Sequence, residues 1–111
     1  MKLYWMDKRG KSLTIFHKLQ TMGLDAMEPK EESHFRYTKQ DWIIVAGEES
    51  WEEMKDKKTG HFILIVPTKN QQKLWQMVCH ERVEDIIDET CQEEYIAKRI
   101  YQTITEKEES K

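Results

Sequence analysis

The sequence of 111 residues has few of the residues that interrupt or cross-link a chain. It contains four Gly, two Pro and two Cys, and no stretch rich in Gly, Ser or Pro divides it. Because its length is also typical of one domain, residues 1–105 are predicted to form a single domain. Residues 106–111, EKEESK, are predicted to be a charged, frayed tail.

Long apolar runs are also missing. No window approaches the roughly 18 uncharged apolar residues that a membrane span requires, and the N-terminal residues become charged before the apolar part of a signal peptide could form. We therefore expect a cytoplasmic protein. The two cysteines, Cys79 and Cys91, fit that compartment as reduced thiols.

Motifs of catalysis and metal binding are absent as well. The sequence has no CxxC or HxxxH pair to start a tetrahedral zinc site, and no GxSxG element of a serine hydrolase. Gly10-Lys11-Ser12 matches the end of a phosphate-binding loop, but Trp5 occupies the position of the first glycine that the loop requires. We predict no catalytic residue, no metal and no cofactor, and favour a protein that is not an enzyme.

A high charge content is combined with enough aromatic residues to build a core. Charged residues make up 35% of the chain and hydrophobic residues 38%. Four Trp, four Tyr and three Phe argue against a disordered chain. The net charge of -3 excludes a globally polybasic nucleic-acid binder, although it leaves room for a local basic patch.

Three short runs, at residues 2–6, 42–46 and 61–66, are rich in the aromatic and β-branched residues that suit a buried pleated surface. Residues 56–60 end in Gly, which tolerates φ > 0, and match a hairpin connection. This hairpin would pair a strand at 50–55 with the strand at 61–66. The first half therefore predicts a small, mostly antiparallel sheet.

Helical spacing of apolar residues predicts one helix over 12–22, with Ser12 as its N-cap and Gly23 as its stop. A strand over residues 12–16 is the alternative. The second half predicts helices over 69–89 and 91–107 that begin with capping boxes at Thr68 and Thr90. Together these elements give an α+β fold. The apolar positions that recur along the first C-terminal helix are Trp75, Val78 or Cys79, Val83, Ile86 and Ile87.

Four carboxylates in the same region are the most unusual feature. Glu81, Glu84, Asp85 and Asp88 follow the spacing i, i+3, i+4, i+7, so a helix would place them on one face. The functional hypothesis is a docking stripe for a partner protein with a basic surface. The simpler explanation is a solvated helix face that keeps the protein in solution.

The N-terminal segment has the opposite charge. Residues 1–18 contain five basic residues and one Asp, a net charge of +4, with aromatic residues among them. Trp5, Lys8, Arg9 and Lys11 could bind an anion or a nucleic acid through phosphate contacts and base stacking. The simpler explanation is that Trp5 faces the core and the basic residues are ordinary surface.

These observations favour a small cytosolic protein-interaction or regulatory module, of the kind found among accessory and phage-encoded proteins. A nucleic-acid-binding module that uses the basic, aromatic N-terminal segment is the alternative. A protein partner is expected and a membrane is not. The identity of the partner and the oligomeric state are left open.

Overall fold

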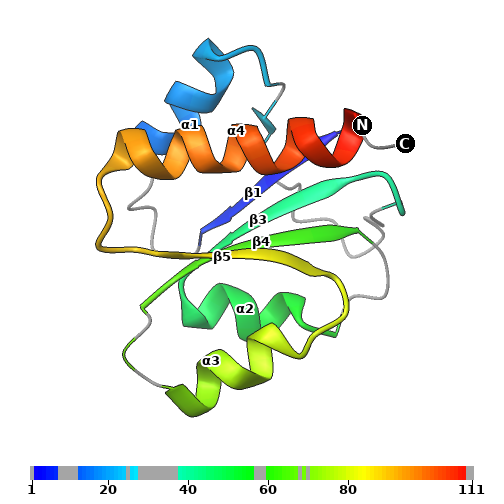
Figure 1. Cartoon of the computed structure of the whole chain (residues 1–111), viewed down its shortest axis with the longest axis vertical. Coiled ribbons are helices and arrows are strands. Elements are labelled where there is room, and N and C mark those ends of the chain that lie inside the picture. Colours follow the sequence, from blue (N-terminus) through cyan, green and yellow to red (C-terminus); the bar gives the residue numbers. More distant parts are fainter. Residues whose placement is uncertain are drawn as a thin grey trace.

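The structure is a computed structural model that describes residues 2–7, 13–24, 26–27, 38–56, 60–67, 69 and 71–109. Strands and helices follow one another along these residues (Figure 1). They are β1 (Leu3–Asp7), α1 (Leu13–Thr21), β2 (Ala26–Met27), β3 (Trp42–Ala46), α2 (Glu48–Met54), β4 (His61–Val66), α3 (Gln71–Val78), β5 (Val83–Asp88) and α4 (Glu93–Glu109).

The described strands form one parallel sheet in the order β2-β1-β3-β4-β5. The chain starts at an interior strand, moves outward to β2, returns to the other side of β1 and continues to the edge at β5. Helices α1 and α4 cover one face of the sheet, and α2 and α3 cover the other (Figure 1). This arrangement is a doubly wound α/β fold.

The predicted α+β fold with a mostly antiparallel sheet is therefore wrong. Residues 50–55, predicted to be a strand, belong to α2 and its C-terminal end, so residues 56–60 lead from a helix to β4 and close no hairpin. Strands β3 and β4 are apolar along their length because helices cover both of their faces. Such unbroken runs are typical of interior parallel strands, whereas a half-exposed antiparallel strand alternates.

Gly60, just before β4, has the positive φ that was predicted for it, although it does not follow a strand. Its φ of +105° lies in a region that side chains disfavour. A Cβ at this position would also lie 2.9 Å from Ile43 Cδ1 on the neighbouring strand. The glycine therefore lets the chain pass close to β3.

The helix predicted over 69–89 is two elements. α3 ends at Val78, a turn includes Glu81 and Arg82, and residues 83–88 form β5. Within the described residues 71–109, no helix ends near Thr90, because β5 precedes it, and a turn joins β5 to α4. α4 begins at Glu93, so the helix predicted over 91–107 is shifted by two residues and Thr90 does not cap it. The Thr90 hydroxyl donates to Asp88 Oδ1 at 2.7 Å and so holds the turn after β5. The predicted capping residue Thr68 lies outside the described residues.

Other predictions are confirmed. The runs at 2–6, 42–46 and 61–66 are β1, β3 and β4, and the helix predicted over 12–22 is α1. Gly23 follows α1 with a φ of +96°, as expected for a residue that ends a helix. The predicted N-cap of α1, Ser12, lies outside the described residues.

The tail predicted at 106–111 is a helix over the part that the structure describes. Residues 106–109 are the end of α4. Lys107 Nζ donates to Glu84 on β5 at 3.0 Å, and Glu108 accepts a hydrogen bond from Trp42 Nε1 at 3.1 Å. These contacts hold the last turn of α4 against the sheet.

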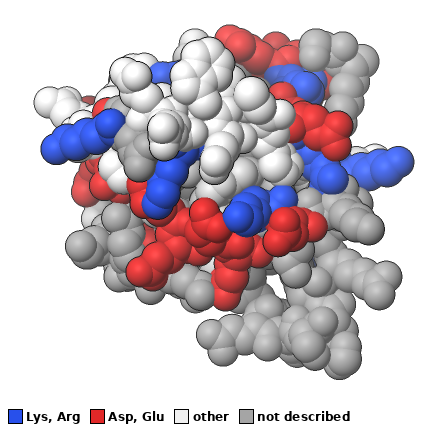
Figure 2. Space-filling view, turned by 90° about the horizontal axis from the view of Figure 1, so that it is seen from below, with Lys and Arg blue, Asp and Glu red and all other residues white. Residues whose placement is uncertain are grey.

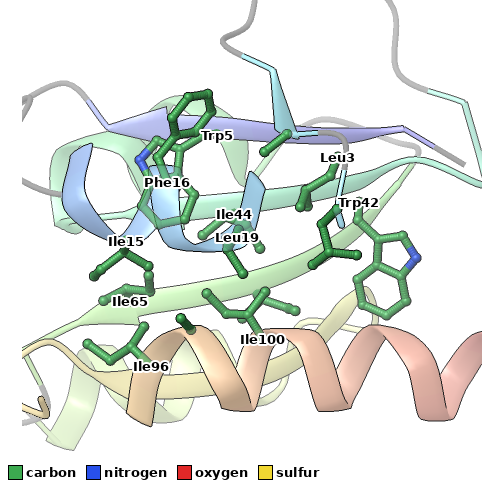
Figure 3. Close-up of a cluster of buried hydrophobic side chains, with 14 of the residues drawn as sticks. Leu3, Trp5, Ile15, Phe16, Leu19, Trp42, Ile44, Ile65, Ile96 and Ile100 are labelled. Carbon is green, nitrogen blue, oxygen red and sulfur yellow. The ribbon is translucent and has the colours of Figure 1, made fainter. Parts of the chain in front are cut away.

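Two apolar cores hold the layers together. The core between the sheet and the α1–α4 layer includes four buried residues of α4 and is shown in part in Figure 3. The core on the other face includes Trp51 and Met54 of α2 but only Met77 of α3. α4 therefore buries more residues against the sheet than α3 does.

Candidate functional site

The carboxyl ends of β1 and β3 are the first place to look for a site, because ligands of doubly wound proteins bind where the strand order reverses. There β1 ends at Asp7 and β3 at Ala46, followed by Gly47. Among the described residues, no group of three or more His, Cys, Asp and Glu side chains is arranged to hold a metal ion. The described part of this edge therefore supplies no candidate metal site.

The four acidic residues predicted to share a helix face do not do so. Glu84, Asp85 and Asp88 lie on β5, and Glu81 lies in the turn before it. The pairing of β4 with β5 shifts register between Phe62 and Ile63, opposite Glu84. Such a bulge redirects side chains, and here both Glu84 and Asp85 contact residues of α4.

Glu84 joins three elements. Its Oε2 accepts a hydrogen bond from Lys107 of α4, and its Oε1 lies 3.0 Å from His61 Nδ1 on β4. An ionised carboxylate only accepts, so His61 Nδ1 donates. Burial alone would raise the pKa of Glu84, but the hydrogen bonds from Lys107 and His61 outweigh it and lower the pKa below 4.5.

Asp85 accepts more hydrogen bonds than Glu84. Arg99 donates to it from Nε at 2.8 Å and from Nη2 at 2.7 Å. The Thr103 hydroxyl lies 3.3 Å from Asp85 and closer, at 2.8 Å, to the Arg99 carbonyl, to which it donates. The hydrogen bond to Asp85 raises the pKa of the Arg99 guanidinium, against the opposing effect of burial. Asp85 Oδ1 also accepts the Ile86 N–H, so the carboxylate occupies a backbone donor of the edge strand.

The other two acids have separate surroundings. Glu81 is exposed and lies 4.0 Å from Arg82. Asp88 accepts from both the backbone N–H and the hydroxyl of Thr90, an Asx-type turn. The structure therefore brings Glu84 and Asp85 together against α4 and leaves Glu81 and Asp88 apart from them.

The predicted basic site has its aromatic residue in the core. Trp5 is 4% exposed and packs edge to face with Phe16, with the ring centroids 6.2 Å apart. A ring buried in this way offers no face on which a base could stack. Lys8, Arg9 and Lys11 lie outside the described residues.

Helix α3 has an exposed apolar stripe. It consists of Leu74, Trp75 and Val78. Together with the polar Gln71, these residues follow the spacing i, i+3, i+4, i+7 and line an open groove of about 380 Å³. Trp75 is 67% exposed and Val78 54% exposed, although both are among the apolar positions that recur at helical spacing. The sequence signal was real, but it marks a helix face that the described residues do not cover.

Helix α2 has an acidic stripe of the same spacing. Glu49, Glu52, Glu53 and Asp56, the last just beyond the helix, are all exposed. Ser50, Trp51 and Met54 are buried beneath them. This is the arrangement that was expected at Glu81–Asp88, and the sequence reasoning missed it because residues 50–55 were taken as a strand.

The two stripes belong to neighbouring helices. Lys73 of α3 donates to Glu48 of α2 at 3.0 Å. At the other end, His80 Nδ1 accepts the Arg82 N–H at 3.3 Å, so its Nε2 carries the proton that is donated to the Lys55 carbonyl at 2.9 Å. The His80 ring also packs against Trp51, with the centroids 5.1 Å apart.

Figure 2 views the face of the molecule on which α2 and α3 lie. Uncharged residues gather over one part of this face, and acidic side chains form a band beside them. Because Lys73 contacts Glu48 and His80 contacts Lys55, the apolar stripe of α3 and the acidic stripe of α2 lie on neighbouring helices of this face. In the part of the chain that the structure describes, no helix is both long and apolar enough to cross a membrane.

Comparisons with known proteins identify the fold. No protein-family model matches the sequence, and a search of curated proteins finds no match either. The structure is similar to that of a response regulator from Thermotoga maritima, with a TM-score of 0.65 over 94% of this chain and 97% of that chain. The two sequences are 15% identical. This likeness shows that the chain has the doubly wound fold of that response regulator.

Proposed function

We propose that this chain is a small regulatory protein that acts by binding another protein, and that the apolar stripe of α3 is its docking surface. The exposure of Trp75 carries the proposal. Tryptophan is among the residues that most often anchor protein interfaces. An exposed tryptophan with Leu74 and Val78 beside it forms the kind of apolar patch that marks an interaction site.

Two further observations support this function. The fold is shared with a protein named as a response regulator, which favours a regulatory role. Trp5 lies in the core, so the basic N-terminal segment has lost the ring on which the nucleic-acid alternative depended. The surface of α3 is thus the better supported binding site.

The test uses three immobilised proteins as baits in a lysate of the cells in which this protein occurs. The baits are wild type, Trp75→Ala and Tyr101→Ala. Tyr101 is an exposed aromatic residue of α4 and serves as the matched control. Proteins retained by wild type and by Tyr101→Ala should be lost with Trp75→Ala, as measured by quantitative mass spectrometry. Circular dichroism should show the same fold for all three. Equal retention by all three baits contradicts the proposal.

A further inference from the structure

We infer that the occupant of the α3 surface is an amphipathic helix with a basic flank. This inference rests on the proposed function and adds the chemical class of the partner. It follows from the composition of the surface, which joins an apolar stripe to an acidic one.

The apolar half fits the side of a helix. Gln71, Leu74, Trp75 and Val78 extend along two turns of α3, and the groove beside them is open at the surface. Helices that dock in such grooves insert apolar residues at the spacing i, i+3, i+4, i+7. Trp75 would be the anchor, because it offers the largest exposed apolar side chain of the stripe.

The acidic half determines the charge of the partner. Residues 48–56 contain five acidic residues and one Lys, so their net charge is -5 + 1 = -4. Glu48 pairs with Lys73 and Glu52 pairs with Lys55, but acidic residues still outnumber basic ones in this segment. This excess of negative charge would attract basic side chains along one flank of the partner while its apolar residues cover α3.

The position of α2 beside α3 makes both contacts available to one partner. The pair between Glu48 and Lys73 and the hydrogen bond between His80 and Lys55 fix the two helices next to each other. A helix docked on Trp75 and Val78 would therefore have the carboxylates of α2 on one side. These carboxylates would attract a basic flank of the docked helix and repel an acidic one.

The experiment uses two synthetic amphipathic helical peptides with the same Leu stripe, one with Lys and the other with Glu along its flank. Neither contains Trp, so tryptophan emission reports on the protein. Trp5, Trp42 and Trp51 are buried, and Trp75 is the exposed one. We expect the basic peptide to shift the emission to shorter wavelength and to bind roughly tenfold more tightly than the acidic one, as a few exposed charge pairs would give.

Variants separate the two contributions. Trp75→Ala should weaken binding of the basic peptide by roughly thirtyfold, the loss expected for an interface anchor. The double variant Glu49→Gln with Glu53→Gln should still bind the basic peptide, but the difference in affinity between the basic and the acidic peptide should become smaller. Raising the salt from about 0.05 M to about 0.5 M should have the same effect on wild type. Glu106→Gln with Glu109→Gln, two exposed acids of α4, is the matched control and should change neither affinity.

Each of the other outcomes contradicts the inference. If both peptides bind equally and Trp75 is required, α3 is a docking surface, but its partner is not basic. If neither peptide binds, an amphipathic basic helix is not the occupant, and the lysate comparison alone decides the proposed function. If sedimentation shows that wild type self-associates and Trp75→Ala does not, the occupant is a second copy of the chain.

Discussion

Helices α4 and α3 lie on opposite faces of the same sheet and differ in how they are attached to it. α4 buries four residues, Ile96, Ala97, Ile100 and Ile104, and is joined to β5 by the contacts of Glu84 and Asp85. α3, which is described throughout its length, buries only Met77 and exposes Trp75 and Val78. The comparison indicates that α4 serves the stability of the fold, whereas α3 leaves apolar residues on the surface that we propose as the docking site.

The largest effect should come from the core beneath α4. Ile100→Ala should lower the free energy of unfolding by about 2–5 kcal/mol, because it removes buried methyl groups and leaves a cavity. Val78→Ala on α3 should change it by less than about 0.5 kcal/mol, because this side chain is already in water. Urea denaturation measures both values. If both variants lose the same free energy of unfolding, α4 and α3 do not differ in how much they stabilise the fold.

A smaller effect should come from the pair between α4 and the edge strand. Arg99→Met should cost about 1–2 kcal/mol, since it leaves a half-buried Asp85 without its two charged hydrogen bonds. Lys98→Met, at the exposed neighbouring position, has a similar helix propensity and should cost little. If the two variants unfold at the same urea concentration, Asp85 does not hold α4 to β5.

The smallest effect should be the pH dependence that Glu84 confers. Because its pKa is lower in the folded protein, its contribution is present above pH 4.5 and is lost as the pH falls through the folded pKa. Glu84→Gln should be about 1 kcal/mol less stable than wild type at pH 7. This difference should shrink as the pH is lowered below 4.5. A difference that stays constant down to pH 3 would show that Lys107 and His61 do not stabilise the charged form.

The sequence predicted the interior strands well, because their apolar runs are strong local signals. It favoured a helix at α1 but left a strand over residues 12–16 as the alternative. It wrongly predicted a mostly antiparallel sheet, because strand direction depends on connections between residues far apart in the chain. Residues 83–88 were assigned to a helix because Val83, Ile86 and Ile87 fit its period. In β5 the alternation of a strand directs Ile86 and Ile87 toward opposite cores, and the bulge after Val83 places Val83 and Ile86 against the same core.

The candidate site was hidden for a related reason. Trp75 and Val78 have the spacing of a core face, and periodicity alone does not say whether a neighbouring element covers that face. The α2 acids were overlooked because Trp51 and Met54, three residues apart on its buried side, were placed in a strand. At α3 the local pattern was correct and its tertiary surroundings decided its role, whereas at α2 the secondary structure itself was predicted wrongly.

The most direct test of the central claim is an NMR map of the binding surface. The basic amphipathic peptide is added to the isotopically labelled protein, and the amide shifts of every helix are followed. We expect the largest changes in α3 and α2, with Trp75 Nε1–H among them, and little change in α4. Shifts concentrated on α4 and β5 instead would contradict the assignment of α3 as the docking surface.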